Sequence, residues 1–232
     1  TTLAYIDTPE KESFVNVDKC GWLANENAEP MLDYALGITI SNAEELKAFA
    51  DQVAAEPTFA DIVGLTTDID MTDETWTPIE GYAGTVLGNG YAIKGLTAPL
   101  FGTTSASIKG LHLTNVVLNS NNNAHYGAFA CELVSASDTV ISTIEHCSVS
   151  GSIVVNCENY EVIVNDHGTL ATGGLVGYTS GVTFSDCVNH ASIDVKQYAK
   201  MGNTQMTTAL IGGVLGCSGA YVREDETYQA SS

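Results

Sequence analysis

Short runs of apolar and β-branched residues recur along this chain, and Gly, Ser, Asn or Asp bounds most of them. Runs of this kind predict short strands joined by turns rather than helices. One stretch, residues 172–195, contains a complete unit. It begins with a pair of glycines, here called the glycine entry, and continues with a short apolar run, a glycine-rich corner and two further β-prone runs. The rest of the sequence is best interpreted by comparison with this unit.

The glycine entry of the unit recurs on both sides. Residues 211–217 (Ile-Gly-Gly-Val-Leu-Gly-Cys) restate residues 172–178 (Thr-Gly-Gly-Leu-Val-Gly-Tyr). A weaker copy lies at 126–131 and a truncated one at 99–102. The entry is therefore one part of a repeat.

A second element of the repeat follows the entry. Residues 144–155 match residues 184–195 at a constant offset of 40 positions, and residues 108–113 fit the same frame. A period of this size indicates a supersecondary unit that stacks on copies of itself. With several short strands per unit, stacking would give a solenoid whose interior is filled by ladders of equivalent residues. A β-propeller would need more even repeats and more strands per unit.

The predicted fold is therefore all-β, a right-handed parallel β-helix, with one capping α-helix near its N-terminus. The β-helix domain is expected over residues 38–232. Residues 1–37 show no period and are interpreted as an irregular leader or the remnant of a preceding domain. The segment 157–170 is predicted to be a long excursion between two coils.

One segment, residues 41–55, has the pattern of a helix. Ser41 followed by Glu44 predicts a capping box at its start. Apolar residues then recur at helical spacing, from Leu46 through Phe49 to Val53. A solenoid needs its first coil covered, because an open end exposes apolar ladder and unpaired strand edge. We expect this helix to be that cover.

The segment 173–187, Gly-Gly-Leu-Val-Gly-Tyr-Thr-Ser-Gly-Val-Thr-Phe-Ser-Asp-Cys, resembles the GLUG-motif repeat of bacterial surface proteins. Residues 65–71, 76–79 and 84–96 resemble the coils that usually precede such repeats. The resemblance implies a parallel β-helix in a secreted or surface-anchored protein, held at the outer membrane. It also implies adhesion or glycan binding without catalysis, with a glycan or a host or cell-surface protein as partner.

The charge balance excludes one class of partner. Lys and Arg total 8 against 28 Asp and Glu, giving a formal net charge of −20. Nucleic-acid binding relies on clustered Lys and Arg, so no nucleic-acid partner is expected. No run approaches the length of a membrane span, so no direct membrane insertion is expected either. The chain begins at Thr1 without Met, which is expected of a processed or trimmed protein, and no signal segment is expected within it.

The cysteines are interpreted as free thiols rather than as a disulfide framework. Cys147 and Cys187 share one position of the repeat, and Cys131 and Cys217 are assigned to another, with Tyr178 between them. Such residues behave as small buried hydrophobes in a ladder. No zinc-ligand spacing is present.

Four acids lie close enough together to suggest a calcium site: Asp68, Asp70, Asp73 and Glu74. The spacing of an EF-hand loop is absent, however. A solvated acidic strand edge explains the same residues. No metal or cofactor is predicted, and calcium stays open as the alternative.

A catalytic alternative comes from the fold class, because parallel β-helices host polysaccharide lyases and glycoside hydrolases. Glycoside hydrolysis needs two carboxylates held across the scissile bond. Glu145, Asp186 and Asp194 lie in or beside repeat strands and could line one face. Fold analogy alone supports this alternative. The histidines show no ligand spacing and are interpreted as solvated or loop residues.

A glycan-binding face could combine aromatic rings with amides. Trp76, Tyr82 and Tyr91 lie near successive corners of the early coils, and Asn121 and Asn122 belong to an Asn-rich loop tip. Core packing is an equally good explanation for Trp76. The sequence thus predicts a non-catalytic adhesin or glycan-binding β-helix. A carbohydrate-active lyase or hydrolase and a purely structural surface stalk are the alternatives, and the oligomeric state is left open.

Overall fold

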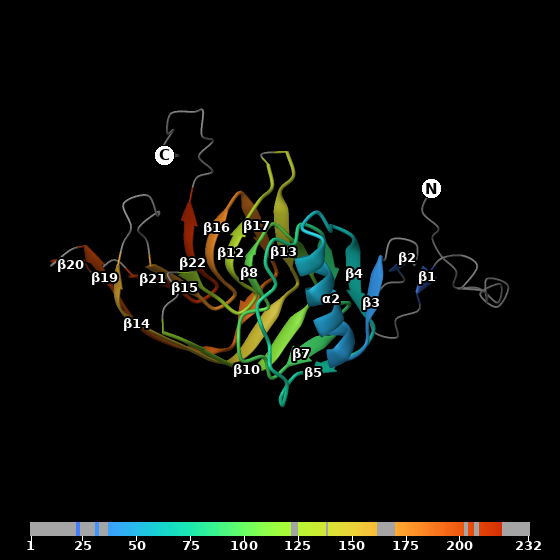
Figure 1. Cartoon of the computed structure of the whole chain (residues 1–232), viewed down its shortest axis with the longest axis horizontal. Helices are drawn as coiled ribbons and strands as arrows, with labels where there is room; N and C mark the ends of the chain where they lie inside the picture. The colour runs from blue at the N-terminus through green and yellow to red at the C-terminus, as the bar shows by residue number, and fades with distance from the viewer. Residues whose placement is uncertain are drawn as a thin grey trace.

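The computed structural model describes residues 22–23, 31–32, 37–121, 125–137, 139–161, 170–201, 204–206 and 209–219. Within these residues the chain is mostly β, and its parallel sheets stack like a solenoid (Figure 1). The first two strands, β1 (Trp22–Leu23) and β2 (Met31–Leu32), pair with each other in antiparallel fashion. Residues 1–21, and with them most of the expected leader, lie outside the described residues.

Two long sheets form most of the solenoid. The first has the order β17 (Val182–Ser185), β13 (Ser142–Glu145), β9 (Ser107–Lys109), β6 (Thr85–Leu87), β4 (Ile62–Leu65), β3 (Ile38–Ile40). The second has the order β20 (Thr204–Met206), β19 (Ser192–Met201), β14 (Ser148–Glu161), β10 (His112–Ser120), β7 (Ala92–Lys94), β5 (Ile69–Asp70), and β18 (Val188–Asn189) also pairs with β14.

Two shorter sheets complete the later coils. One contains β11 (His125–Tyr126), β15 (Leu170–Gly173) and β21 (Ala209–Gly212). The other contains β8 (Phe101–Thr104), β12 (Ala130–Val134), β16 (Val176–Ser180) and β22 (Leu215–Gly219). The chain passes through one strand of each sheet, from β13 to β16, before β17 begins the next coil.

The register confirms the repeat that the sequence indicates. Ile108 pairs with Ile144, and Ile144 pairs with Phe184 on the next coil. The two glycine entries also coincide, because Thr172 pairs with Ile211. Equivalent residues of successive coils therefore lie side by side, as a solenoid requires. The handedness of the coil stays a prediction.

The interior is a continuous apolar ladder. Ile108, Ile144 and Val149 are fully buried in it. Its first coils are filled by an aromatic cluster in which Tyr82 and Phe101 stack with ring centroids 5.9 Å apart. Phe49 meets the edge of Tyr82 at 5.1 Å, so the cluster also joins the helix to the coils.

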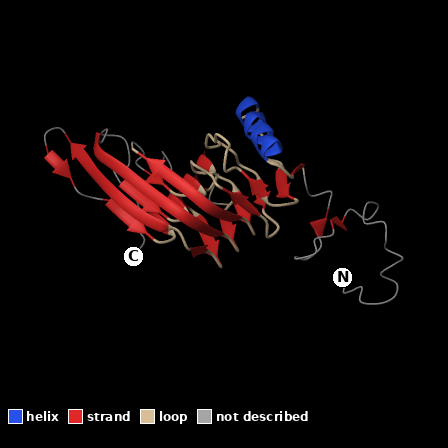
Figure 2. Ribbon diagram, turned by 90° about the horizontal axis from the view of Figure 1, so that it is seen from below, coloured by secondary structure: helices blue, strands red, loops and turns tan. Residues whose placement is uncertain are grey.

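The one α-helix of the described residues, α2 (Ala43–Ala55), lies near the N-terminal end of the solenoid (Figure 2). The N-cap residue of this helix is one position later than the sequence predicted. Asn42, not Ser41, is the N-cap and accepts a hydrogen bond from the Glu45 N–H at 2.9 Å. The Glu45 carboxylate in turn accepts from the Ser41 N–H at 2.6 Å. The predicted Ser41 capping box and the observed Asn42 N-cap both satisfy free N–H groups at the start of a helix, and Asn is as effective an N-cap as Ser.

The helix packs on the first coils through Leu46, Phe49 and Val53, as its apolar spacing predicts. In the part of the chain that the structure describes, no helix is both long and apolar enough to cross a membrane.

The predicted excursion 157–170 begins as a strand instead, so the prediction is wrong for residues 157–161. β14 continues to Glu161 and pairs with β19 as far as Lys200, and β20 pairs with β19 in antiparallel fashion. Both views show these strands extending beyond the coils at the end away from α2 (Figures 1 and 2). Residues 162–169 lie outside the described residues.

Replacing a ring of the aromatic cluster is expected to destabilise the protein strongly. Phe101 is fully buried, so Phe101→Ala should lower the free energy of unfolding by about 3–5 kcal/mol. Val117, 52% exposed on β10, provides the control, and Val117→Ala should change it by less than about 0.5 kcal/mol. Chemical denaturation measures both. Equal losses in the two variants would contradict this account of the core.

Candidate ligand-binding hollow

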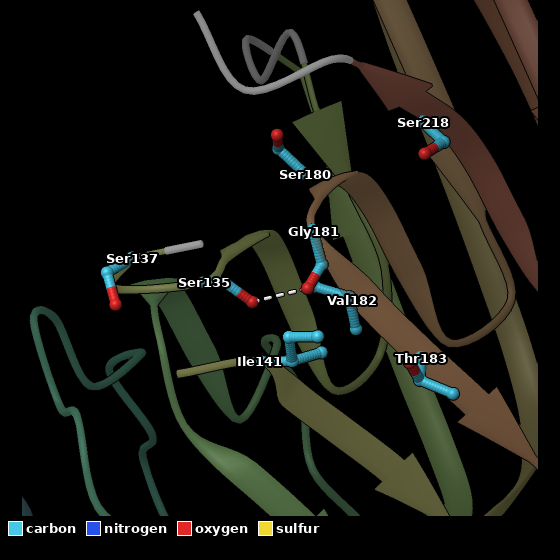
Figure 3. Close-up of a pocket in the computed structure, with 8 residues that line it drawn as sticks. All are labelled: Ser135, Ser137, Ile141, Ser180, Gly181, Val182, Thr183 and Ser218. Carbon is cyan, nitrogen blue, oxygen red and sulfur yellow. Dashed lines mark hydrogen bonds between the residues drawn. The ribbon is translucent and has the colours of Figure 1, made fainter. Parts of the chain in front are cut away.

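A hollow of about 450 Å³ lies where the four-stranded sheet turns into the six-stranded sheet (Figure 3). Its volume is within the range of small-molecule sites in proteins. No lining residue is charged, and five of the eight carry hydroxyl groups. The lining consists of Ser135, Ser137, Ile141, Ser180, Gly181, Val182, Thr183 and Ser218.

The corners of three coils build the hollow. Ser135 follows β12, Gly181 joins β16 to β17, and Ser218 lies on β22. Gly181 has a φ of +68°, a conformation that glycine adopts without steric cost. A side chain at this position would also approach Cβ of Ser135 within 3.2 Å. Glycine therefore allows the tight corner that leaves the hollow open.

Ser135 ties the corner together. Its hydroxyl donates to the carbonyl of Gly181 at 2.5 Å, the bond drawn in Figure 3, and accepts from the Ser142 N–H at 2.8 Å. Its own N–H donates to the carbonyl of Ser180 at 2.9 Å. A second hydroxyl acts in the same way one coil earlier, because Ser142 Oγ donates to the Ser105 carbonyl at 2.7 Å. Buried hydroxyls thus join successive coils along this corner.

Ser180 differs from Ser135, because its hydroxyl is unused. The residue is 3% exposed, and its Oγ has no hydrogen-bond partner among the described residues. Thr183 and Ser218 are exposed at the same hollow, and so is the apolar side chain of Ile141, at 55%. Each hydroxyl can both donate and accept a hydrogen bond. The arrangement can hold a neutral polar molecule and pack an apolar face against Ile141.

Three of the four acids proposed for calcium are held by separate partners. Asp68 pairs with Lys94 at 2.7 Å, and Glu74 pairs with Lys47. Asp70 accepts from Thr72 Oγ1 at 2.6 Å. Asp73 is exposed. No group of three acidic, His or Cys side chains gathers as a metal site would require within the described ranges.

The carboxylates of the catalytic alternative do not face one another across a cleft. Glu145 pairs with Lys109 at 3.2 Å. Asp186 lies at the corner after β17, 3.5 Å from His146, and both of these side chains are mostly exposed. Asp194 lies on β19, in the other long sheet. The structure brings Glu145 and Asp186 to one edge of the solenoid but leaves Asp194 apart.

Two of the three rings proposed for glycan stacking are not accessible. Trp76 is 8% exposed and donates to the Pro99 carbonyl at 2.9 Å. Tyr82 is fully buried, and its hydroxyl donates to the Asp61 carbonyl at 2.5 Å. These two rings are part of the core and cannot stack on a sugar, because packing inside the coil takes up both faces. Tyr91 is half-buried against the core.

The Asn-rich tip is described only in part. Asn121 is exposed at the end of β10, and Asn122 lies outside the described residues.

One histidine departs from the sequence interpretation. His125 is buried rather than solvated, at 6% exposed. Its Nδ1 lies 2.8 Å from Glu132 Oε1, and its ring stacks on Tyr178 with centroids 5.0 Å apart. These three residues come from three different strands, so no local spacing could have indicated the cluster. It fastens the corner between the two short sheets.

The positions that the cysteines were predicted to share in the repeat are partly confirmed. All four described cysteines are free: Cys131, Cys147, Cys187 and Cys217. Cys217 pairs with Tyr178, but Tyr178 pairs with Glu132, so Cys131 lies one position away from the predicted column. Cys20 and the side chain of Cys157 lie outside the described residues.

Comparison with known proteins identifies a structural neighbour. No family model and no curated protein matches the chain. A crystal structure from Bacteroides ovatus, of a protein provisionally named an immunoglobulin A1 protease, is similar with a TM-score of 0.51 and 16% sequence identity. The match covers 78% of this chain and 61% of the other, so it spans less than two thirds of the neighbour. At this identity the likeness concerns the fold alone.

The two buried serines of the hollow should respond differently to loss of the hydroxyl. Ser135→Ala leaves the buried Ser142 N–H without its acceptor, and we expect a loss of about 1–3 kcal/mol in the free energy of unfolding. Ser180→Ala removes an unpaired hydroxyl and should be neutral or slightly stabilising. Denaturant titration of both variants measures the difference, and a larger loss for Ser180→Ala would contradict the hydrogen bonding described.

The Asp68–Lys94 pair should make a pH-dependent contribution to stability. The hydrogen bonds from Lys94 and from the Ala92 N–H hold the pKa of Asp68 below its ordinary value. A carboxylate whose folded pKa is depressed stabilises the protein above its unfolded pKa of about 3.9 and loses that contribution as pH falls through the folded pKa. Asp68→Asn should therefore lower the thermal midpoint slightly at neutral pH. The difference should shrink as pH falls through the folded pKa of Asp68, and a difference that did not change with falling pH would have another cause.

Proposed function

We propose that this chain is a secreted or surface-anchored bacterial adhesion module, a right-handed parallel β-helix that binds neutral glycans without cleaving them. The observation that carries the proposal is the uncharged, hydroxyl-lined hollow in a protein with a net charge of −20. The resemblance of residues 173–187 to the GLUG repeat of surface proteins supports the location.

The lining suits a sugar ring. A glycan presents hydroxyl groups that can exchange hydrogen bonds with Thr183 and Ser218, and C–H faces that can pack on Ile141. The protein's charge disfavours uronates, sialic acids and sulfated sugars, because an anionic ligand would approach a strongly negative surface. Neutral glycans should therefore bind better than acidic glycans of similar size.

A peptidase or a carbohydrate-active enzyme is the second candidate: the structural neighbour's provisional name suggests the first, and the fold class suggests the second. Glu145 pairs with Lys109 at 3.2 Å, Asp186 lies 3.5 Å from His146, and neither carboxylate lines the hollow. We therefore expect binding without turnover. Product analysis after incubation with a bound glycan and with immunoglobulin A1 tests this directly.

The binding test is a glycan array with the full chain, with and without calcium, followed by titration of any neutral glycan retained. Thr183→Val removes one exposed hydroxyl from the hollow and should weaken binding about threefold to tenfold. Thr39→Val is the matched control, because Thr39 is exposed on β3 at the opposite edge of the same sheet. Ile141→Asp should weaken binding further, whereas Val117→Asp, on the other long sheet, should not.

The outcomes separate the candidates. Equal glycan affinities of the Thr183→Val and Thr39→Val variants would show that the hollow is not the binding site. A preference for acidic glycans would contradict the electrostatic argument, and cleaved product would establish an enzyme. Glycan binding that depends on calcium would favour a calcium site among the acids between Asp68 and Glu74. An array without any hit would favour a protein ligand or a stalk.

A further inference from the structure

Cys147 and Cys187 occupy the same corner in successive coils. Each is the second residue after a strand of the six-stranded sheet, Cys147 after β13 and Cys187 after β17. The flanking pairs, Glu145 with Ser185 and Ser148 with Val188, place the two cysteines directly beside each other.

The two corners also have the same backbone conformation. The residues before the cysteines, His146 and Asp186, have φ values of 52° and 50°. Equivalent conformations turn the two side chains to the same side of the coil. Cys147 Sγ accordingly lies 3.7 Å from the Ile108 carbonyl of the preceding coil, and Cys187 Sγ lies 3.2 Å from the equivalent Ile144 carbonyl.

The separation suits a disulfide. Neighbouring strands of a sheet lie about 4.8 Å apart, and disulfides join Cα atoms separated by about 4.4–6.8 Å. Each sulfur atom lies against the equivalent carbonyl of the preceding coil, so the two side chains run in the same direction one strand spacing apart.

The two thiols differ in accessibility and in acidity. Cys147 is 1% exposed, whereas Cys187 is half-buried and can be reached from solvent. The neighbouring thiol raises the pKa of Cys147, with burial adding to the effect, and lowers the pKa of Cys187. Because the thiolate is the nucleophile in disulfide exchange, the accessible cysteine is also the more reactive one.

We propose that Cys147 and Cys187 are a redox-active pair, which a small-molecule disulfide oxidises to a disulfide that staples two successive coils. The Cys187 thiolate attacks one sulfur of the oxidant, forms a mixed disulfide and expels the first thiolate. Cys147 then gives its proton to that thiolate and attacks Cys187 Sγ, which expels the second thiolate. The pair loses two electrons, and the oxidant becomes two thiols.

The test exposes the full chain to oxidised glutathione, alkylates the remaining thiols and maps the peptides by mass spectrometry. We expect a cross-linked peptide that joins Cys147 to Cys187. The staple closes a long loop, so the thermal midpoint should rise by roughly 5–10 °C and return on reduction. Cys187→Ser should abolish the rise, and Cys217→Ser should keep it, because Cys217 lies against Tyr178 in another column.

Three results would overturn the proposal. A glutathione adduct that persists on Cys187 while Cys147 is still alkylated would show that the second step does not occur. A cross-link from Cys187 to any other cysteine would show that the column is not the reacting pair. An absence of reaction at both residues would show that the pair is inert. Mapping the unmodified chain means that none of these results depends on how well a variant folds.

Discussion

In-register pairing of equivalent residues between successive coils is the constraint on which the rest of the structure depends. One column of paired residues contains Ile108, Ile144 and Phe184. Because their backbones pair, the apolar side chain of each coil packs on that of the preceding coil. A coil cannot bury its apolar face alone, so stability comes from the stack rather than from any one unit. The aromatic cluster around Tyr82 and helix α2 extend the same ladder into the first coils.

The same register also groups functional side chains at the corners. The residue at a given corner of one coil lies beside the residue at the same corner of the next coil. Along one corner the repeated type is a hydroxyl, and Ser135 and Ser142 join the coils there while Thr183 and Ser218 open onto the hollow. Along another it is a thiol, in Cys147 and Cys187. The offset of the repeat predicted the thiol pair, whereas the group of hydroxyls was not predicted because its members come from different positions of the coil.

Sequence patterns were sufficient for the architecture, because strand period, glycine corners and helix spacing are local properties. The pairing of Thr172 with Ile211 could be predicted from the repeated entry. The cap moved from Ser41 to Asn42 because both side chains can accept the same kind of hydrogen bond. Cys131 was assigned to the wrong column because matching by residue type ignored the register that pairs Glu132 with Tyr178. Burial of Tyr82 depends on the assembled coil and could not be predicted from the sequence near it, whereas core packing was one of the two explanations open for Trp76.

We propose that a ligand binds in the uncharged corner hollow. Hydrogen exchange of the full chain with and without a neutral oligosaccharide retained on the array tests it most directly, because exchange reports on backbone amides segment by segment. We expect added protection in residues 135–142 and 180–185, with residues 62–71 unchanged. Protection concentrated on another face of the solenoid, with residues 135–142 and 180–185 unaffected, would contradict it.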